Sequence, residues 1–242
     1  MKKKVRPIVV GFPLYEGVTL VDFAGATEVF SFTNGRFTPI WFANEKKPVP
    51  TSEGAAVFPH YSFHEKHPKI DILFIPGGGA PGVCNAMFNK EYQAFIKKTA
   101  VRAQWVGSVC VGAFILAAAG LLKDCKATTY WSQVPNLALL SKKLNLRVPK
   151  GNPRGIIDKK RKIFTGGGIS SSLDLALELV ETILGKGYAQ QAQLFIQYAP
   201  VPPVHAGDPQ QAPKRLVEKV LKEEAAYNAI YHNAVLKLLQ QL

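Results

Sequence analysis

Short apolar runs alternate along the chain with segments whose apolar residues recur at helical spacing. The runs rich in β-branched and aromatic residues predict buried strands at residues 5–12, 39–43, 70–75, 105–109, 126–130 and 162–165. The helical spacing predicts helices at residues 21–32, 90–102, 111–122, 134–140 and 171–184. Because strands and helices alternate, the pattern predicts an α/β fold with a mostly parallel sheet and helices on both faces.

Three of these predicted strands end in segments suited to chemistry. The strand at 70–75 runs into Pro76-Gly-Gly-Gly79, the strand at 105–109 into Cys110, and the strand at 162–165 into Gly166-Gly-Gly168. Ligands of parallel α/β folds bind beyond the carboxyl ends of the strands. We therefore expect these three segments to converge on one site.

The composition changes at residue 200. Five prolines between residues 200 and 213 predict an extended arm, and residues 214–242 follow as a predicted helix. Its apolar stripe consists of Leu216, Val217, Val220 and Leu221. The prediction is an α/β domain at residues 1–199 and an arm at 200–242, packed on that domain or on a partner subunit.

Composition restricts the class of protein. The 242 residues are 47% hydrophobic, enough for a full core, and 30 Lys and Arg against 17 Asp and Glu give a net charge of +13. The basic residues are spread along the chain, without a helix-turn-helix pattern or basic-aromatic interleaving. We expect no specific nucleic-acid partner. The apolar run after Lys2 to Lys4 reads as a strand rather than a signal peptide, and no stretch of eighteen apolar residues occurs, so we expect a cytoplasmic protein with no membrane partner.

The cysteines and histidines do not form a metal-site pattern. Cys84, Cys110 and Cys125 lack paired spacing, and an odd number does not suit a disulfide framework, so a reducing compartment fits best. The histidines at 60, 64 and 67 fall in a segment that its flanking prolines predict to be a loop. Neither phosphate-binding glycine motif is present. We predict no metal and no cofactor.

Cys110 is the leading candidate for a reactive residue. It lies between a predicted strand and the first turn of a predicted helix, where the helix dipole and unpaired N–H groups stabilise a thiolate and lower its pKa. The same amides can hold negative charge on a substrate, and Gly112 permits close approach. The G-x-C-x-G string is incomplete, because Ser108 replaces the first glycine. The alternative is that Cys110 is a small buried hydrophobe.

Several motifs in order resemble those of the ThiJ/PfpI superfamily. They are Thr19-Leu-Val-Asp22-Phe-Ala-Gly25, Ile75-Pro-Gly-Gly-Gly79, Ser108-Val-Cys110-Val-Gly-Ala113, Ala117-Ala-Ala-Gly-Leu-Leu122 and Ala127-Thr-Thr-Tyr-Trp131. The likeness spans residues 5–212. It implies a flavodoxin-like three-layer sandwich of the class I glutamine amidotransferase type, a homodimer, and a cysteine nucleophile at Cys110.

Within that superfamily the chain is similar to the isonitrile hydratase branch and to the sensor domains of AraC-type regulators. The features are Asp22, the segment Thr165-Gly-Gly-Gly-Ile-Ser-Ser-Ser-Leu-Asp174, and the proline-rich arm. The resemblance implies a lyase in which Cys110 attacks an isonitrile carbon and Asp22 moves the proton, giving an N-substituted formamide through a thioimidate. The predicted substrate- or oxyanion-binding residues are Gly78, Gly79, Val111 and Gly112. The alternative for Asp22 is an acid that complements the dipole of its helix.

Two departures from the family pattern keep a second function open. Val111 stands where hydratase-like members carry threonine, and Tyr130 stands where many members carry histidine, which removes the partner of a protease-like Cys–His pair. The alternative is a redox- or ligand-sensing stress protein with an oxidisable Cys110 and no turnover. A third hypothesis is the sensor half of a transcription factor, but residues 214–242 are too few for two helix-turn-helix units.

Overall fold

A seven-stranded sheet forms the centre of the computed structural model, which describes residues 6–242. Residue 5, the first of the predicted strand 5–12, and the basic residues Lys2 to Lys4 lie outside the described residues. The strand order is β5 (Tyr61–Ser62), β2 (Phe37–Ala43), β1 (Ile8–Pro13), β6 (Ile72–Ile75), β7 (Trp105–Ser108), β9 (Ile163–Gly166) and β8 (Gly155–Asp158). All neighbours are parallel except β8 and β9. A separate hairpin joins β3 (Val49–Pro50) to β4 (Ala56–Val57).

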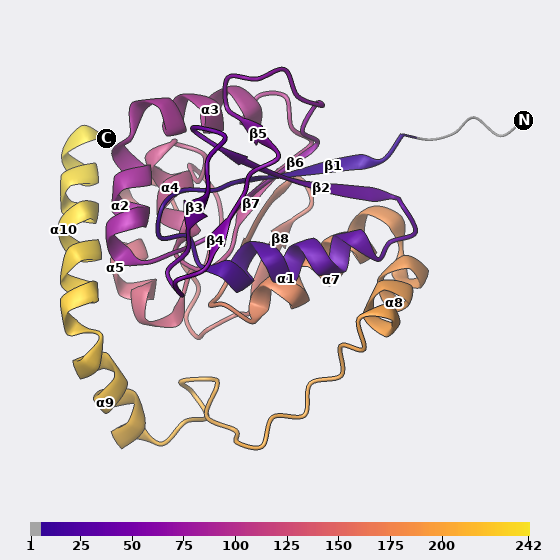
Figure 1. Cartoon of the computed structure of the whole chain (residues 1–242). Helices are drawn as coiled ribbons and strands as arrows, with labels where there is room; N and C mark the ends of the chain where they lie inside the picture. The colour runs from indigo at the N-terminus through magenta and orange to yellow at the C-terminus, as the bar shows by residue number, and fades with distance from the viewer. Residues whose placement is uncertain (1–5) are drawn as a thin grey trace, which may run out of the picture.

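Helices cover both faces of this sheet (Figure 1). One layer holds α1 (Leu20–Ser31), α7 (Ser171–Leu184) and α8 (Lys186–Phe195). The other holds α2 (Ala80–Phe88), α3 (Lys90–Ala100), α4 (Gly112–Ala118), a 3₁₀ turn (Trp131–Gln133), α5 (Val134–Leu139) and α6 (Ser141–Leu144). The flavodoxin-like three-layer arrangement predicted from the sequence is confirmed.

Aromatic side chains from three strands and one helix form the centre of the core. The rings of Phe12 and Phe74 are 5.1 Å apart, and Phe164 lies at the same distance on the other side of Phe74. Phe30 of α1 meets Phe74 edge-on. These strands therefore share one packed layer, which holds their carboxyl ends at fixed spacing.

The predicted strand at 126–130 is wrong. Its one sheet-like contact is an isolated bridge between Lys126 and Arg147. The edge position beside β9 belongs instead to β8, which the sequence pattern did not predict. The segment nevertheless runs against the sheet, since the Thr128 N–H donates to the hydroxyl of Thr165. Its apolar pattern marks burial rather than strand pairing.

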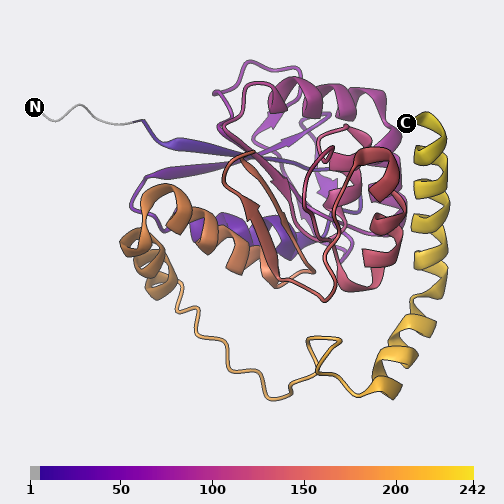
Figure 2. The same ribbon diagram turned by 180° about the vertical axis from the view of Figure 1, so that it is seen from behind.

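The C-terminal prediction is corrected in two respects. The single predicted helix is divided at Glu224 into α9 (Lys214–Glu223) and α10 (Ala225–Gln241). No residue of α9, including its predicted apolar stripe, is buried. The buried stripe belongs to α10, which packs on α2 and α5 through Tyr231, Ala234, Val235 and Leu238. Figure 2 shows the linker from α8 running beneath the body to reach α9. The division into domain and arm stays a prediction.

Candidate active site

Cys110 occupies a strained turn between β7 and α4. Its φ angle is +53°, in the left-handed region that few residues other than glycine adopt. Its N–H donates to the carbonyls of Gly166 (3.1 Å) and Gly167 (2.7 Å), and its carbonyl accepts from the Thr129 hydroxyl (2.9 Å). The loop after β9 and the segment after residue 126 thus hold the turn from two sides.

Asp22 lies beside Cys110 at the N-terminal turn of α1. Its side chain is fully buried, and Oδ2 accepts the N–H of Gly77 at 2.8 Å, whereas Oδ1 has no hydrogen-bond partner among the described residues. A Cβ on Gly77 would lie 2.8 Å from both Asp22 Oδ2 and Cys110 Cβ. Glycine is therefore required where the loop after β6 brings the two side chains together.

Burial sets the protonation of this pair. It raises the pKa of Asp22 from its ordinary 3.8 to about 8, although the Gly77 N–H opposes the shift. Burial also raises the pKa of the Cys110 thiol, a charged Asp22 adds to that rise, and the Val111 N–H opposes it. This direction is opposite to the one that the helix N-terminus predicts, because the sequence does not reveal how deeply the thiol is buried. At neutral pH Asp22 carries a proton.

Two backbone amides face the thiol's surroundings. Gly77 and Gly79 flank Gly78 and bond to the segment 17–19: the Gly77 carbonyl accepts from Thr19 N (3.0 Å), and Gly79 N donates to the Gly17 carbonyl (2.8 Å). Gly78 and Val18 face each other in an isolated antiparallel bridge, as a pair without hydrogen bonds between its two members. The N–H of Gly78 therefore points away from Val18. The Val111 N–H opposes the rise of the pKa of the Cys110 thiol. Of the four predicted binding residues, Gly78 and Val111 therefore offer N–H groups.

Gly79 and Gly112 have other surroundings. Gly79 lines the cavity above Cys110, but its own N–H is used by Gly17. A Cβ on Gly112 would lie 2.6 Å from the Ile75 carbonyl oxygen. Gly112 is absent from the described lining of the cavity. It permits α4 to pack closely on the end of β6.

The C-terminal helices form one wall of a cavity of about 300 Å³ above Cys110. The Tyr130 hydroxyl donates to Glu224 Oε1 at 2.9 Å, and the Tyr231 hydroxyl donates to the Gly78 carbonyl at 2.9 Å. The Tyr231 ring stacks on Phe114, with 5.7 Å between centroids. Sequence reasoning identified Tyr130 as unusual but missed Glu224 and Tyr231, since no local pattern links residues so distant in sequence.

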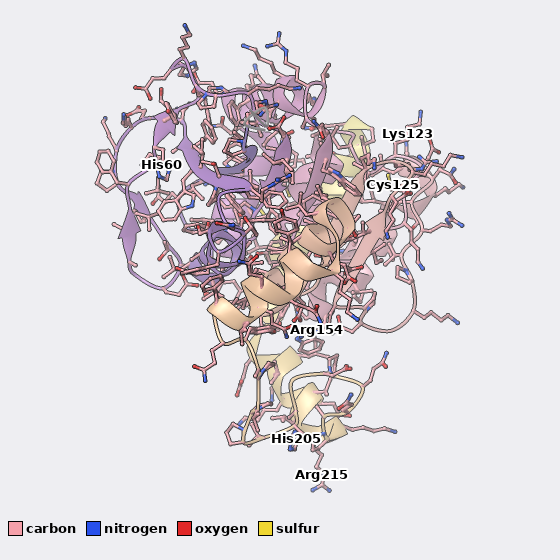
Figure 3. The ribbon with its side chains drawn as sticks, turned by 90° about the vertical axis from the view of Figure 1, so that its right-hand side faces the viewer. His60, Lys123, Cys125, Arg154, His205 and Arg215 are labelled. Carbon is pink, nitrogen blue, oxygen red and sulfur yellow. The ribbon has the colours of Figure 1, made fainter. Side chains whose placement is uncertain are left out.

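The other two cysteines lie outside this cavity. Burial raises the pKa of Cys84 to about 11. The Cys125 thiol lies 3.3 Å from the Lys123 carbonyl, in the loop after α4, and Figure 3 shows these two residues side by side. Within residues 6–242, no His, Cys, Asp and Glu side chains group to hold a metal ion, and no helix has the length and apolarity to cross a membrane.

Comparison with known proteins gives the family. The model of the DJ-1/PfpI family matches residues 9–182, which include Asp22, the loop after β6 and Cys110. The chain belongs to the DJ-1/PfpI family. The sequence-based prediction of this superfamily is therefore confirmed.

Individual relatives place this DJ-1/PfpI protein more finely. It is 34% identical over 220 residues to the isonitrile hydratase of Pseudomonas putida, covering 89% of this chain and 90% of that protein. A crystal structure of a ThiJ/PfpI family protein from Pseudomonas syringae superposes with a TM-score of 0.86 at 30% identity, covering 96% and 93% of the two chains.

The predicted similarity to AraC-type regulators is also found. The chain is 27% identical over 180 residues to the HTH-type transcriptional regulator GbdR of Pseudomonas aeruginosa. That match covers 72% of this DJ-1/PfpI chain but only 46% of the regulator. The similarity thus extends over less than half of the regulator.

Proposed function

We propose that this DJ-1/PfpI protein hydrates isonitriles to N-substituted formamides, with Cys110 as nucleophile. The observation that carries the proposal is the fully buried Asp22 carboxyl, which lies beside Cys110 and is protonated at neutral pH, while Cys110 itself lines the cavity. The 34% identity to an isonitrile hydratase along nearly the whole chain supports the same reaction class. Asp22 then serves as the acid and base of the site, rather than only as a complement to the dipole of α1.

In the first step the thiol adds across the terminal carbon of the isonitrile. A bond forms between Cys110 Sγ and that carbon, the carbon gains a proton through Asp22, and the thiol proton replaces the one that Asp22 gave up. The product is a thioimidate, in which carbon carries one hydrogen and is doubly bonded to nitrogen. The N–H groups of Gly78 and Val111 stabilise charge that develops during the addition.

In the second step water resolves the thioimidate. The water oxygen bonds to the same carbon, and one of its protons goes to the nitrogen. The carbon–sulfur bond then breaks, the second water proton returns to Cys110 through Asp22, and the N-substituted formamide leaves. The sum is one isonitrile and one water in, one formamide out, and the proposal therefore needs no external cofactor.

The test is formamide production from cyclohexyl isonitrile, followed by chromatography. We expect turnover by the wild-type chain, no turnover by Cys110→Ala, and a loss of about 10²-fold or more in kcat for Asp22→Asn. Cys125→Ala is the matched control, because that thiol lies outside the cavity, and it should retain wild-type activity. Absence of formamide from the wild type, or full activity in Cys110→Ala, would contradict the proposal.

The second candidate is a sensor whose Cys110 is oxidised without turnover. Val111 favours it, because no hydroxyl follows the cysteine to assist hydration. Burial and the raised pKa of the thiol oppose it, since exposed thiolates oxidise most readily. Peptide mass spectrometry after mild peroxide distinguishes the two. Sulfenic or sulfinic acid at Cys110 alone, in a chain with no hydratase activity, would favour the sensor; equal oxidation of Cys84 and Cys125 would not.

A further inference from the structure

A second cavity, of about 500 Å³, lies between the C-terminal arm and the body of the molecule. Its arm side is formed by the linker and by α9, and its body side by α1, the loop after β9 and the start of α7. Figure 3 shows Arg154 of the body facing the part of the arm that carries His205 and Arg215. The cavity explains why α9 has no buried residue: its apolar residues Leu216, Val217 and Val220 face this space.

The second cavity adjoins the cavity above Cys110. Tyr130 and Ile169 line both. Tyr130 is held at this boundary by its hydrogen bond to Glu224, and Ile169 is 45% exposed. A molecule lying in the larger cavity can therefore extend past these two side chains to the thiol.

The walls of the second cavity are mostly apolar. Val21, Leu173 and Trp131 on the body face the apolar residues of α9. The apolar residues of α9 are exposed or half-buried, which is unfavourable in water, and an apolar ligand between the two sides would remove them from solvent. This favours an alkyl or aryl group as the occupant.

The floor of the same cavity carries polar atoms without partners. Ser171 is 1% exposed, lines the cavity, and its hydroxyl has no hydrogen-bond partner among the described residues. Asn152 is half-buried and also lines the cavity, and its buried Oδ1 likewise has no partner among these residues. Buried polar atoms are normally satisfied, so these two are free to bond a ligand. Arg154 forms an ion pair with Asp174 and also donates to Ser170 Oγ (3.1 Å). Because its charge is compensated, the floor suits a neutral polar group better than an anion.

We propose that this second cavity binds the body of the substrate, an elongated apolar group bearing one neutral hydrogen-bonding function, while its reactive carbon reaches Cys110. The inference rests on the proposed function for the reactive end. The smaller cavity alone is at the lower limit of ligand sites, about 300–1,000 Å³, whereas the two combined suit a larger molecule. The preferred substrate is then a long-chain or arylalkyl isonitrile with a hydroxyl or amide, and short alkyl isonitriles are poor ones.

The first test compares ethyl isonitrile with decyl isonitrile. We expect the wild type to have a higher kcat/KM for the decyl compound than for the ethyl compound. In Val217→Arg the ratio of the decyl to the ethyl value should fall at least tenfold, because a guanidinium would enter the apolar cavity. The matched control is Leu221→Arg, on the same helix but absent from the lining of both cavities. An equal ratio in Val217→Arg and the wild type would overturn the subsite.

A second variant tests the polar floor. Ser171→Ala removes a hydroxyl that has no hydrogen-bond partner in residues 6–242, so the fold should tolerate it. We expect kcat/KM for 10-hydroxydecyl isonitrile to fall about tenfold while that for decyl isonitrile is retained. A preference of the wild type for a carboxylate-terminated analogue would show that the floor is an anion site, contrary to the proposal.

A binding measurement separates this inference from the proposed reaction. N-decylformamide and N-ethylformamide, titrated calorimetrically into Cys110→Ala, report the subsite without turnover. Tighter binding of the decyl compound, lost with an added Val217→Arg change, supports the subsite even if no isonitrile is hydrated. Equal binding of the two compounds overturns it. Dissociation of an oligomer in Val217→Arg, with the chain-length preference unchanged, would assign this face to a second copy of the chain and also overturn it.

Discussion

The burial of Asp22 supplies the site with a protonated carboxyl but makes its ionisation costly to the folded state. Its carboxyl is fully buried, so ionisation is unfavourable in the folded chain, whereas in the unfolded chain it is ordinary. The resemblance of motifs predicted that Asp22 meets Cys110, and the structure brings them together. The pKa values of Asp22 and Cys110 are raised because both side chains are buried, and the residue types alone do not reveal that burial. Glu224 and Tyr231 follow from the docking of a distant helix, so sequence reasoning could not identify them.

We predict that Asp22 makes the folded state less stable as pH rises. Its pKa is about 8 when folded, against an ordinary 3.8, so between these values the native state binds one proton more than the unfolded state. The free energy of unfolding therefore falls with rising pH, by at most about 1.4 kcal/mol per pH unit from this group, and levels off above pH 8.

The measurement is urea unfolding of the wild type and Asp22→Asn at pH 5 and pH 8. Asparagine keeps an oxygen for the Gly77 N–H but cannot ionise. The stability of Asp22→Asn relative to the wild type should be greater at pH 8 than at pH 5. The contributions of other titrating groups cancel in the difference between the unfolding free energies of the two proteins. If that difference is the same at pH 5 and pH 8, the pKa of Asp22 is not raised.

At the scale of elements, α10 determines whether the site is closed. It contributes Tyr231 to the cavity wall and buries Leu238 against the body. The sequence predicted a single helix at residues 214–242, where the structure has α9 and α10. It assigned the buried stripe to α9, because the spacing of Leu216, Val217 and Val220 is equally typical of a buried face and of a cavity wall. The missed strand β8 shows the same limit, since its residues are only partly buried.

We predict that weakening α10 exposes Cys110. Leu238→Ala removes a side chain that is 3% exposed, which costs about 2 kcal/mol or more, so the helix should detach at least about tenfold more often. Alkylation of Cys110 by iodoacetamide, followed by mass spectrometry, should accelerate accordingly. Leu236→Ala, on the exposed side of α10, is the control and should react at the wild-type rate. Equal rates in both variants would show that reagents reach the thiol without opening of α10.

At the scale of the whole molecule, the exposed apolar surface indicates how two copies would meet. Phe32 at the end of α1 stacks on Phe195 of α8 at 5.8 Å, and both rings remain largely exposed beside Leu194. An apolar patch of this kind commonly marks an interface. The order of apolar runs was enough to predict the parallel α/β fold, because the central strands β6, β7 and β9 are buried on both faces. It did not predict this patch, which depends on how α1 and α8 lie together.

We predict that the chain is a homodimer that uses this patch. Light scattering should give twice the mass of one chain, and Phe195→Asp should shift the equilibrium toward the monomer. Val101→Asp, at an exposed position after α3, is the control and should leave the dimer intact. A monomeric wild type, or a dimer indifferent to Phe195→Asp, would contradict the prediction.

The wall that α9 and α10 supply has a consequence for the chain during its synthesis. Translation completes Asp22, the glycine loop and Cys110 well before it reaches Glu224 and Tyr231. At about 5–20 residues per second, that interval is on the order of ten seconds. During that time the nascent polypeptide presents its thiol without its cover, so electrophiles in the cell have a brief opportunity to modify the protein that closes once α10 is in place.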